Sequence, residues 1–489
     1  MGRPRCKGIA VTASRSSVAG TFSALRERDF AWYFAGNTTF FLAMQMNQLL
    51  RGYLAYELTD AAVALGLIAV TMAFPMLFIA PIGGVIADRY NKRTLLVIVQ
   101  FFTAGVNAVL AALIIADLVE FWHLLVSTLA LGISISIAMP ARQAMVPSLV
   151  PQHRMMNAIS LQMGSMNLTR IIGPAVGGLL IAPLGIGLVW AFGVFLYLIS
   201  IATLFPLPKH GMVATHEIHG FREDLAGGFR YVAARPVLRL LIVTGMMMPL
   251  FAFPVQMVLP VFAEDVFEQG PGALGVLMAA AGVGGLIGAL ISANLDHVAR
   301  KSGIMLAGTL IMSVSYVVFA QSTAFGLPTS TAFALGLVAF GVGNIGGMLF
   351  QTTNNSTIQA LVSDELRGRV MSVLMMSFGI MPLGILPLTI AVDTFGAPAT
   401  VAVSSALMLV SLLVFFALSA QLRGLSVEAL AHAELSPAQA AALVAEGKIS
   451  PEDAERLTGR AAQHERDAEP VGVSRDRTLV EVSSDADVA

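Results

Sequence analysis

Long apolar blocks alternate with short polar connections along most of this chain. The blocks reach the roughly 20 residues that a helix needs to cross the ~30 Å hydrocarbon core of a bilayer. The expected spans cover residues 31–56, 63–87, 94–116, 121–145, 158–182 and 186–206, and then 239–262, 271–293, 303–321, 330–353, 369–392 and 397–420. The pattern therefore predicts an all-α membrane protein with twelve transmembrane helices.

Basic residues are confined to alternate connections between these spans. Neither Lys nor Arg occurs in connections 56–64, 116–121, 182–188, 262–271, 322–330 and 392–398, several of which hold acids instead. The other connections carry Lys and Arg, as in the loop with Arg89, Lys92 and Arg93. Because positively charged flanks stay on the cytoplasmic side, this distribution predicts that both termini are cytoplasmic.

The spans fall into two groups that a longer polar connection separates. We expect a cytoplasmic N-terminal arm (1–29), an N-terminal six-helix bundle (30–206), a central cytoplasmic loop (207–237), a C-terminal six-helix bundle (238–420) and a cytoplasmic tail (421–489) that is partly helical and then disordered. Residues 64–66 at the start of the second span read Ala-Leu-Gly, as do residues 273–275 at the start of the eighth. Weak similarity of this kind is typical of transporters that contain two related halves.

Composition narrows the class of protein further. Of the 489 residues, 56% are hydrophobic and 12% are charged, which excludes an ordinary water-soluble globule. The net charge of −1 gives no reason to expect a nucleic-acid partner, and the single cysteine, Cys6, excludes an intramolecular disulfide. The sequence contains no catalytic, metal-binding or phosphate-binding motif, so we expect no enzyme activity, no cofactor and no metal.

The loop after the second span carries a patterned set of residues: Gly84, Asp88, Arg89, Lys92 and Arg93. An ordinary cytoplasmic loop explains the basic residues but not the spacing of Gly and Asp. The set resembles the signature of the major facilitator superfamily, with Asn91 where a second Gly is usual. The resemblance implies a latch for the outward-facing state. It also implies two pseudo-symmetric six-helix bundles, with a central cavity that opens to alternate sides.

The fifth span contains the small residues and proline of a second motif: Gly173, Pro174, Gly177 and Gly178. It resembles the motif of exporters in the same superfamily, although Thr169 stands where a further Gly is usual. The resemblance implies export by antiport, while close helix packing alone is the alternative explanation. Segments 56–59, 140–142, 149–151, 157–158 and 367–371 are similar to the subfamily of enterobactin exporters, macrolide efflux proteins and lysophospholipid transporters.

Polar side chains inside the spans are candidates for lining a cavity: Arg170 and Asn167 in the fifth span, Gln48 and Arg51 in the first, and Asn344, Gln351 and Asn354 in the tenth. A charge at the bilayer centre costs ~2.5 to 3.5 kcal/mol on insertion scales, so Arg170 either binds substrate, takes part in gating or forms a buried pair. Arg51 could instead reach the outer interface, and the amides could cross-link helices. Arg142 is expected at the cytoplasmic interface, and three prolines, Pro249, Pro254 and Pro260, predict a bent seventh span.

No Asp or Glu lies in the middle of a span, so an anionic or neutral amphiphile fits the expected cavity better than a hydrophobic cation. The leading hypothesis is a monomeric, multi-pass transporter of the cytoplasmic membrane that exports drug-like, siderophore-like or other amphiphilic small molecules. Proton coupling is a hypothesis that comes from the family resemblance. Uptake and lysophospholipid-like lipid transport are the alternatives, followed by a receptor or enzyme.

Overall fold

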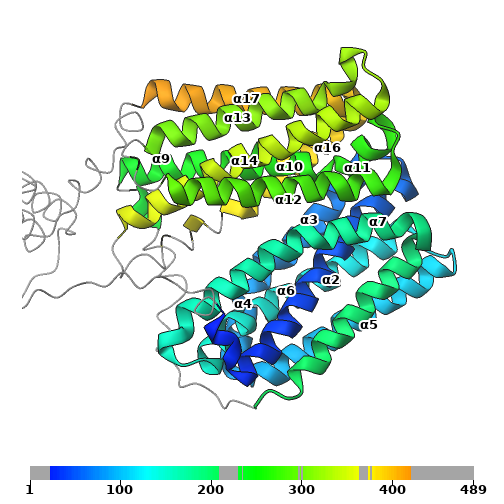
Figure 1. The fold of residues 1–489 in the computed structure, drawn as a ribbon, viewed down its shortest axis with the longest axis vertical. Coiled ribbons are helices and arrows are strands. Elements are labelled where there is room, and N and C mark those ends of the chain that lie inside the picture. The colour runs from blue at the N-terminus through cyan, green and yellow to red at the C-terminus, as the bar shows by residue number, and fades with distance from the viewer. Residues whose placement is uncertain are drawn as a thin grey trace, which may run out of the picture. The chain divides into compact units, whose positions relative to one another are not determined.

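A computed structural model describes residues 22–208, 229–233, 235–295, 298, 301–362, 370, 373–374 and 377–419 (Figure 1). The regular elements within these ranges are helices. The N-terminal bundle consists of α2 (Arg28–Thr59), α3 (Ala62–Phe78), α4 (Ala80–Arg89), α5 (Lys92–Ile115), α6 (Phe121–Leu149) and α7 (Met155–Leu204). The C-terminal bundle consists of α9 (Pro236–Gly245), α10 (Phe253–Met257), α11 (Leu259–Val261), α12 (Gly270–Asn294), α13 (Lys301–Ala320), α14 (Thr329–Leu361), α16 (Met381–Phe395) and α17 (Ala397–Leu418). The expected tail and most of the arm and central loop lie outside the described residues.

Eight helical stretches in the described part of the chain are long and apolar enough to cross a membrane. The helix α2 is not among them, since polar side chains such as Gln45, Gln48 and Arg51 interrupt its apolar run. The apolar helices α3 and α16 are shorter. The chain is thus a helical, multi-pass membrane protein. The number of twelve spans and the cytoplasmic side of both termini stay predictions.

The helices are irregular at two places. The backbone of α7 leaves the helical conformation at Gly185 (φ 76°, ψ 155°), between the fifth and sixth expected spans. A positive φ of this kind is readily adopted only by glycine. The seventh expected span, with its three prolines, is interrupted twice: the wider turn η3 (Met248–Ala252) separates α9 from α10, and Val258 separates α10 from α11. A second wider turn, η4 (Phe262–Val266), follows α11. Proline removes a backbone donor and disturbs the preceding turn, which accounts for these interruptions.

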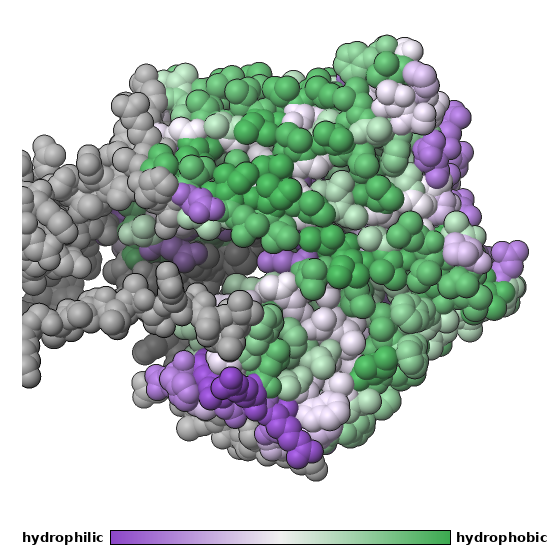
Figure 2. All heavy atoms as spheres, in the orientation of Figure 1, coloured by the Kyte–Doolittle hydropathy of each residue, from purple (hydrophilic) through white to green (hydrophobic). Residues whose placement is uncertain are grey.

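Helices within each bundle pack side by side, and two helix pairs form the largest contacts between the bundles (Figure 1). In the N-terminal bundle α7 packs on α2 and α5, and in the C-terminal bundle α14 packs on α12 and α13. Across the bundles α7 contacts α12, and α3 contacts α16. Figure 2 shows that the visible flank of the helices is largely hydrophobic. Such a surface suits lipid, because the helices satisfy their own backbone hydrogen bonds.

The repeated Ala-Leu-Gly triplets lie at these two contacts between the bundles. Gly66 in α3 faces α16, where a Cβ atom would collide with the Thr389 hydroxyl. Gly275 in α12 faces α7, where a Cβ atom would lie 2.9 Å from the Cα atom of Gly178. Both glycines therefore allow a helix of one bundle to approach a helix of the other closely.

Candidate functional site

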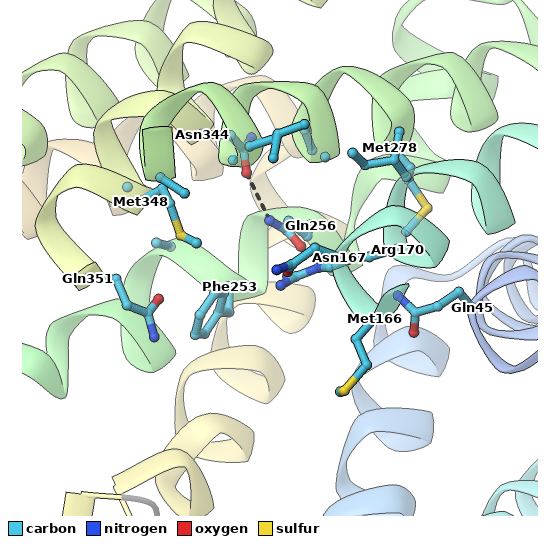
Figure 3. A pocket seen from close by; sticks show the side chains of 18 of the residues that line it. Gln45, Met166, Asn167, Arg170, Phe253, Gln256, Met278, Asn344, Met348 and Gln351 are labelled. Atoms are coloured by element: carbon cyan, nitrogen blue, oxygen red, sulfur yellow. Dashed lines mark hydrogen bonds between the residues drawn. The ribbon is translucent and has the colours of Figure 1, made fainter. Parts of the chain in front are cut away.

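A cavity of about 400 Å³ lies between the two bundles. Its walls come from α2 and α7 on one side and from η3, α10, α11, α12, α13 and α14 on the other. Figure 2 shows the hollow between the two groups of helices, and Figure 3 shows its lining side chains. The position between two packed bundles is typical of a small-molecule site.

The polar centre of this cavity is built from both bundles. Arg170 of α7 is the one charged side chain among the described lining residues. It lies beside the Tyr316 hydroxyl of α13, which in turn lies beside the amides of Gln256 and Asn344. The Gln256 Nε2 atom donates a hydrogen bond to the Asn344 Oδ1 atom at 3.2 Å, and Arg170 and Asn167 point toward this pair (Figure 3). A positive charge thus meets hydroxyl and amide groups at the junction of the bundles.

The remaining wall is mostly apolar and flexible. Six methionines line the cavity: Met44, Met166, Met248, Met278, Met312 and Met348. Unbranched thioether side chains adapt to ligands of different shape. Phe41 and Phe253 add flat apolar surface. The composition of the cavity therefore suits an amphiphile, because one lining side chain is cationic and most of the others are flexible and hydrophobic.

Five of the predicted cavity residues line this space: Arg170, Asn167, Gln48, Asn344 and Gln351. Sequence reasoning missed Gln45, Gln256 and Tyr316, which also line it. Gln45 stands one helical turn before Gln48, so helical spacing was the signal that pointed to it. Gln256 lies in the proline-rich span, where the interruptions hide any simple periodicity.

Two predicted cavity residues lie elsewhere. Arg51 is 4% exposed inside the N-terminal bundle, with its guanidinium 5.6 Å from the centre of the Trp190 ring. Asn354 is buried against α9, and its side-chain amide occupies the space beside Gly245. Neither residue belongs to the lining of the cavity. A role in contact with substrate for these two side chains stays a prediction.

The expectation that Arg142 lies at the membrane interface was wrong. The side chain is 2% exposed inside the N-terminal bundle. Its Nη1 atom donates to the Asn37 Oδ1 atom at 2.7 Å, and its guanidinium lies 3.8 Å from the centre of the Phe40 ring. The hydrogen bond and the aromatic face offset part of the cost of burying the charge. The helix α6 continues to Leu149, so Arg142 lies about two turns inside the helix rather than at its cytoplasmic end, and neighbouring helices surround it.

The small residues of the fifth span form two contacts along α7. Gly173 and Gly177 face α2, where added Cβ atoms would lie 2.7 Å and 2.9 Å from side-chain carbons of Gln45 and Met46. Gly178 faces α12, where an added Cβ atom would lie 2.6 Å from the Cα atom of Gly275. Pro174 is buried in the same part of α7. The motif thus brings α7 close to a helix of its own bundle and to one of the other bundle.

Two basic residues of the predicted latch, Lys92 and Arg93, are anchored within the N-terminal bundle. Lys92 donates to the Ala144 carbonyl at 3.2 Å. Arg93 donates to the carbonyls of Leu204 and Phe205 at 2.9 Å and 2.6 Å, where it neutralises the negative C-terminal end of α7. Arg89 is exposed, and the space beside Gly84 is open. The side chain of Asp88 lies outside the described part of the structure, so the latch stays a prediction.

Two helical bundles with an apolar flank and a shared central cavity define a multi-pass membrane transporter. The sequence matches the family described as transmembrane secretion effector over residues 19–448, most of its length. The chain belongs to this family of the major facilitator superfamily, as its motifs indicated. Members of the family and the relatives below are transporters rather than enzymes.

Known proteins with similar sequences include two transporters. The staphyloferrin A transporter of Staphylococcus aureus is 25% identical over 412 residues, which cover 80% of this chain and 96% of that protein. The enterobactin exporter EntS of Shigella boydii is 29% identical over 257 residues, which cover 50% of this chain and 58% of that protein.

Solved structures share the fold at low sequence identity. A bacterial homologue of the iron transporter ferroportin in an inward-facing state has a TM-score of 0.62 and 15% identity, and the match covers 79% of this chain and 98% of that chain. The nucleoside transporter NupG has a TM-score of 0.62 and 14% identity, with 80% and 98% covered.

Proposed function

We propose that this protein exports a siderophore-like or similar amphiphilic small molecule that carries acidic groups, by alternating access through the central cavity. The molecule binds between the bundles, and its acidic group approaches Arg170. The proposal includes twelve spans with both termini in the cytoplasm, and coupling of export to the proton gradient.

The observation that carries this proposal is the charge of the cavity. Arg170 is charged, and the described lining residues include no Asp or Glu. An anionic group entering this low-dielectric space gains a charged hydrogen-bond partner, whereas a cationic group meets repulsion. The names of the relatives, a staphyloferrin A transporter and an enterobactin exporter, support a siderophore-like substrate.

The direct test is the accumulation of fluorescent anionic, neutral and cationic amphiphiles in cells that express the protein. The wild type is compared with Arg170→Ala and Asp88→Asn, with and without an uncoupler. Arg170→Lys retains the positive charge, and Leu168→Ala alters an exposed residue of α7 that does not line the cavity. Both serve as matched controls at equal amounts of inserted protein.

We expect wild-type cells to accumulate less of an anionic probe, and the uncoupler and Asp88→Asn to abolish this difference. Loss of a charged hydrogen bond costs roughly 1.5–3 kcal/mol, so Arg170→Ala should weaken apparent affinity about 10- to 100-fold. Arg170→Lys should retain part of the activity, and Leu168→Ala should behave as wild type. Export of cations but not anions would contradict the substrate class. Higher accumulation in wild-type cells would instead indicate uptake.

A further inference from the structure

The connection from α2 to α3 is held by two aspartates of the other bundle. Asp393 of α16 accepts hydrogen bonds from the backbone N–H groups of Ala62, at 2.6 Å, and Val63, at 2.9 Å. One of its carboxylate oxygens serves each donor. At the other end of the connection, the Tyr56 hydroxyl donates to the Asp265 carboxylate of η4. Donors from the N-terminal bundle therefore meet acceptors from the C-terminal bundle at two points.

Asp393 supplies a helix cap that α3 lacks within its own bundle. The first N–H groups of a helix have no partner inside that helix. The N-cap residue of α3 is Ala61, which has no side-chain acceptor, so the Asp393 carboxylate takes that role from the other bundle. Asp393 itself stands in the last turn of α16, where a negative charge is unfavourable to its own helix dipole. Its placement is therefore explained by α3 rather than by α16.

The two aspartates lie at one end of the contact between the bundles. The connection precedes α3, whereas the basic residue Arg89 ends α4 and Lys92 begins α5, so the two sets lie at opposite ends of the same expected span. Thr389, about one turn before Asp393 in α16, packs against Gly66 of α3. The hydrogen bonds of Asp393 thus lie next to the close contact between α3 and α16 at Gly66.

A pair of like charges opposes contact between the two bundles at the same face. The carboxylate of Glu57 in the last turn of α2 interacts with that of Glu264 in η4 across the two bundles. Ionised, these groups repel each other, while Asp265 and Asp393 hold the connection. Contact between the bundles at this face is therefore favoured by Asp265 and Asp393 and opposed by the pair of Glu57 and Glu264.

We propose that Asp265 and Asp393 form a two-point clamp on the connection between α2 and α3, and that this clamp holds the cavity closed on the face opposite the basic loops. Opening toward that face requires both carboxylates to release their donors. The proposal rests on alternating access, the cycle assumed in the proposed function, but needs neither the proposed substrate nor the direction of transport.

The test measures the distance between the bundles at this face with paired spin labels. Leu118 follows α5 in the N-terminal bundle, and Phe325 ends η5 (Ser322–Phe325) in the C-terminal bundle. Both side chains are well exposed, which suits cysteine labelling. The labels are placed at Leu118→Cys and Phe325→Cys in a Cys6→Ser background of the full chain, without substrate. Electron–electron resonance then gives the populations of short and long distances.

Four variants test the clamp in this background. Asp393→Asn replaces one acceptor oxygen by an N–H₂ group. Ala62→Pro removes one donor and leaves Asp393 intact, since proline is accepted at the first helical position and the extended Ala61 suits the residue before it. Glu57→Gln removes the repulsion. Asp117→Asn, in the connection after α5, is the matched control for loss of an acid.

We expect Asp393→Asn and Ala62→Pro each to raise the ratio of long to short distances about five- to tenfold, which corresponds to the loss of a helix cap. Glu57→Gln should lower this ratio, and Asp117→Asn should leave it unchanged. A double variant of Asp393→Asn and Ala62→Pro should change the ratio by less than the product of the two single effects. An unchanged ratio in both single variants, with well-folded protein, would overturn the clamp. A shifted ratio without any amphiphile transport would support the clamp and count against the proposed function.

Discussion

The substitution Gly178→Ala should push α7 away from α12. An added Cβ atom would lie 2.6 Å from the Cα atom and 2.8 Å from the backbone nitrogen of Gly275, and 3.0 Å from the Pro271 carbonyl oxygen. Carbon atoms in contact normally stay about 3.5–4.0 Å apart, so the helices must separate by roughly 1 Å. These three atoms belong to the backbone, so no change of side-chain rotamer can move them away.

The magnitude follows from two opposing effects. Overpacking costs about 1–3 kcal/mol, while alanine in place of glycine favours the helix by up to ~1 kcal/mol. We expect a net destabilisation of about 1–2 kcal/mol for the conformation in which α7 and α12 touch. Gly164→Ala is a matched control on the same helix, because the space beside Gly164 is open and only the helical gain applies.

The assay is thermal denaturation of the purified protein, together with the spin-label distance across the bundles. Gly178→Ala should lower the melting temperature or lengthen that distance relative to wild type. Gly164→Ala should leave the distance unchanged and raise the melting temperature slightly. If Gly178→Ala matched Gly164→Ala in both measurements, the close contact with Gly275 would not contribute to this conformation.

Two further substitutions test other contacts by thermal denaturation. Asn91 caps α5 by accepting a hydrogen bond from the Thr94 N–H at 3.1 Å, so Asn91→Ala should cost about 1 kcal/mol and Asn91→Gly only a few tenths; equal losses in both would contradict the cap. The buried Trp190 donates to the Asn107 Oδ1 atom at 3.1 Å, so Trp190→Phe should cost about 1–3 kcal/mol. Trp122→Phe changes an exposed residue and should have little effect, and a similar loss at both positions would refute this reasoning.

The sequence predicted the helical membrane class and much of the cavity, because both depend on local pattern. Apolar length identifies helices that lipid can surround, and helical spacing placed Arg170 and Asn167 on one face. Gln48 and Asn344 were predicted because a polar group inside a span needs a partner from protein or water. The side of the termini depends on charge distribution alone and stays a prediction.

What the sequence could not predict depends on how the helices are rotated and packed. Gln48 and Arg51 are one turn apart on α2, yet Gln48 lines the cavity while Arg51 lies against Trp190. The direction of a long side chain is set by its neighbours rather than by its own helix. Tyr316 joins the polar centre only because α13 is packed with this face toward the cavity.

The two largest contacts between the bundles are related as in a symmetric dimer. The Gly66 region of α3 meets α16, and the Gly275 region of α12 meets α7, so the start of the second expected span of each half touches the fifth expected span of the other. This reciprocity is the defining property of an isologous interface between identical subunits. A single ancestral half could therefore have formed both contacts with a second copy of itself. Joining the halves in one chain then allowed Asp393 to arise at one contact without a counterpart at the other.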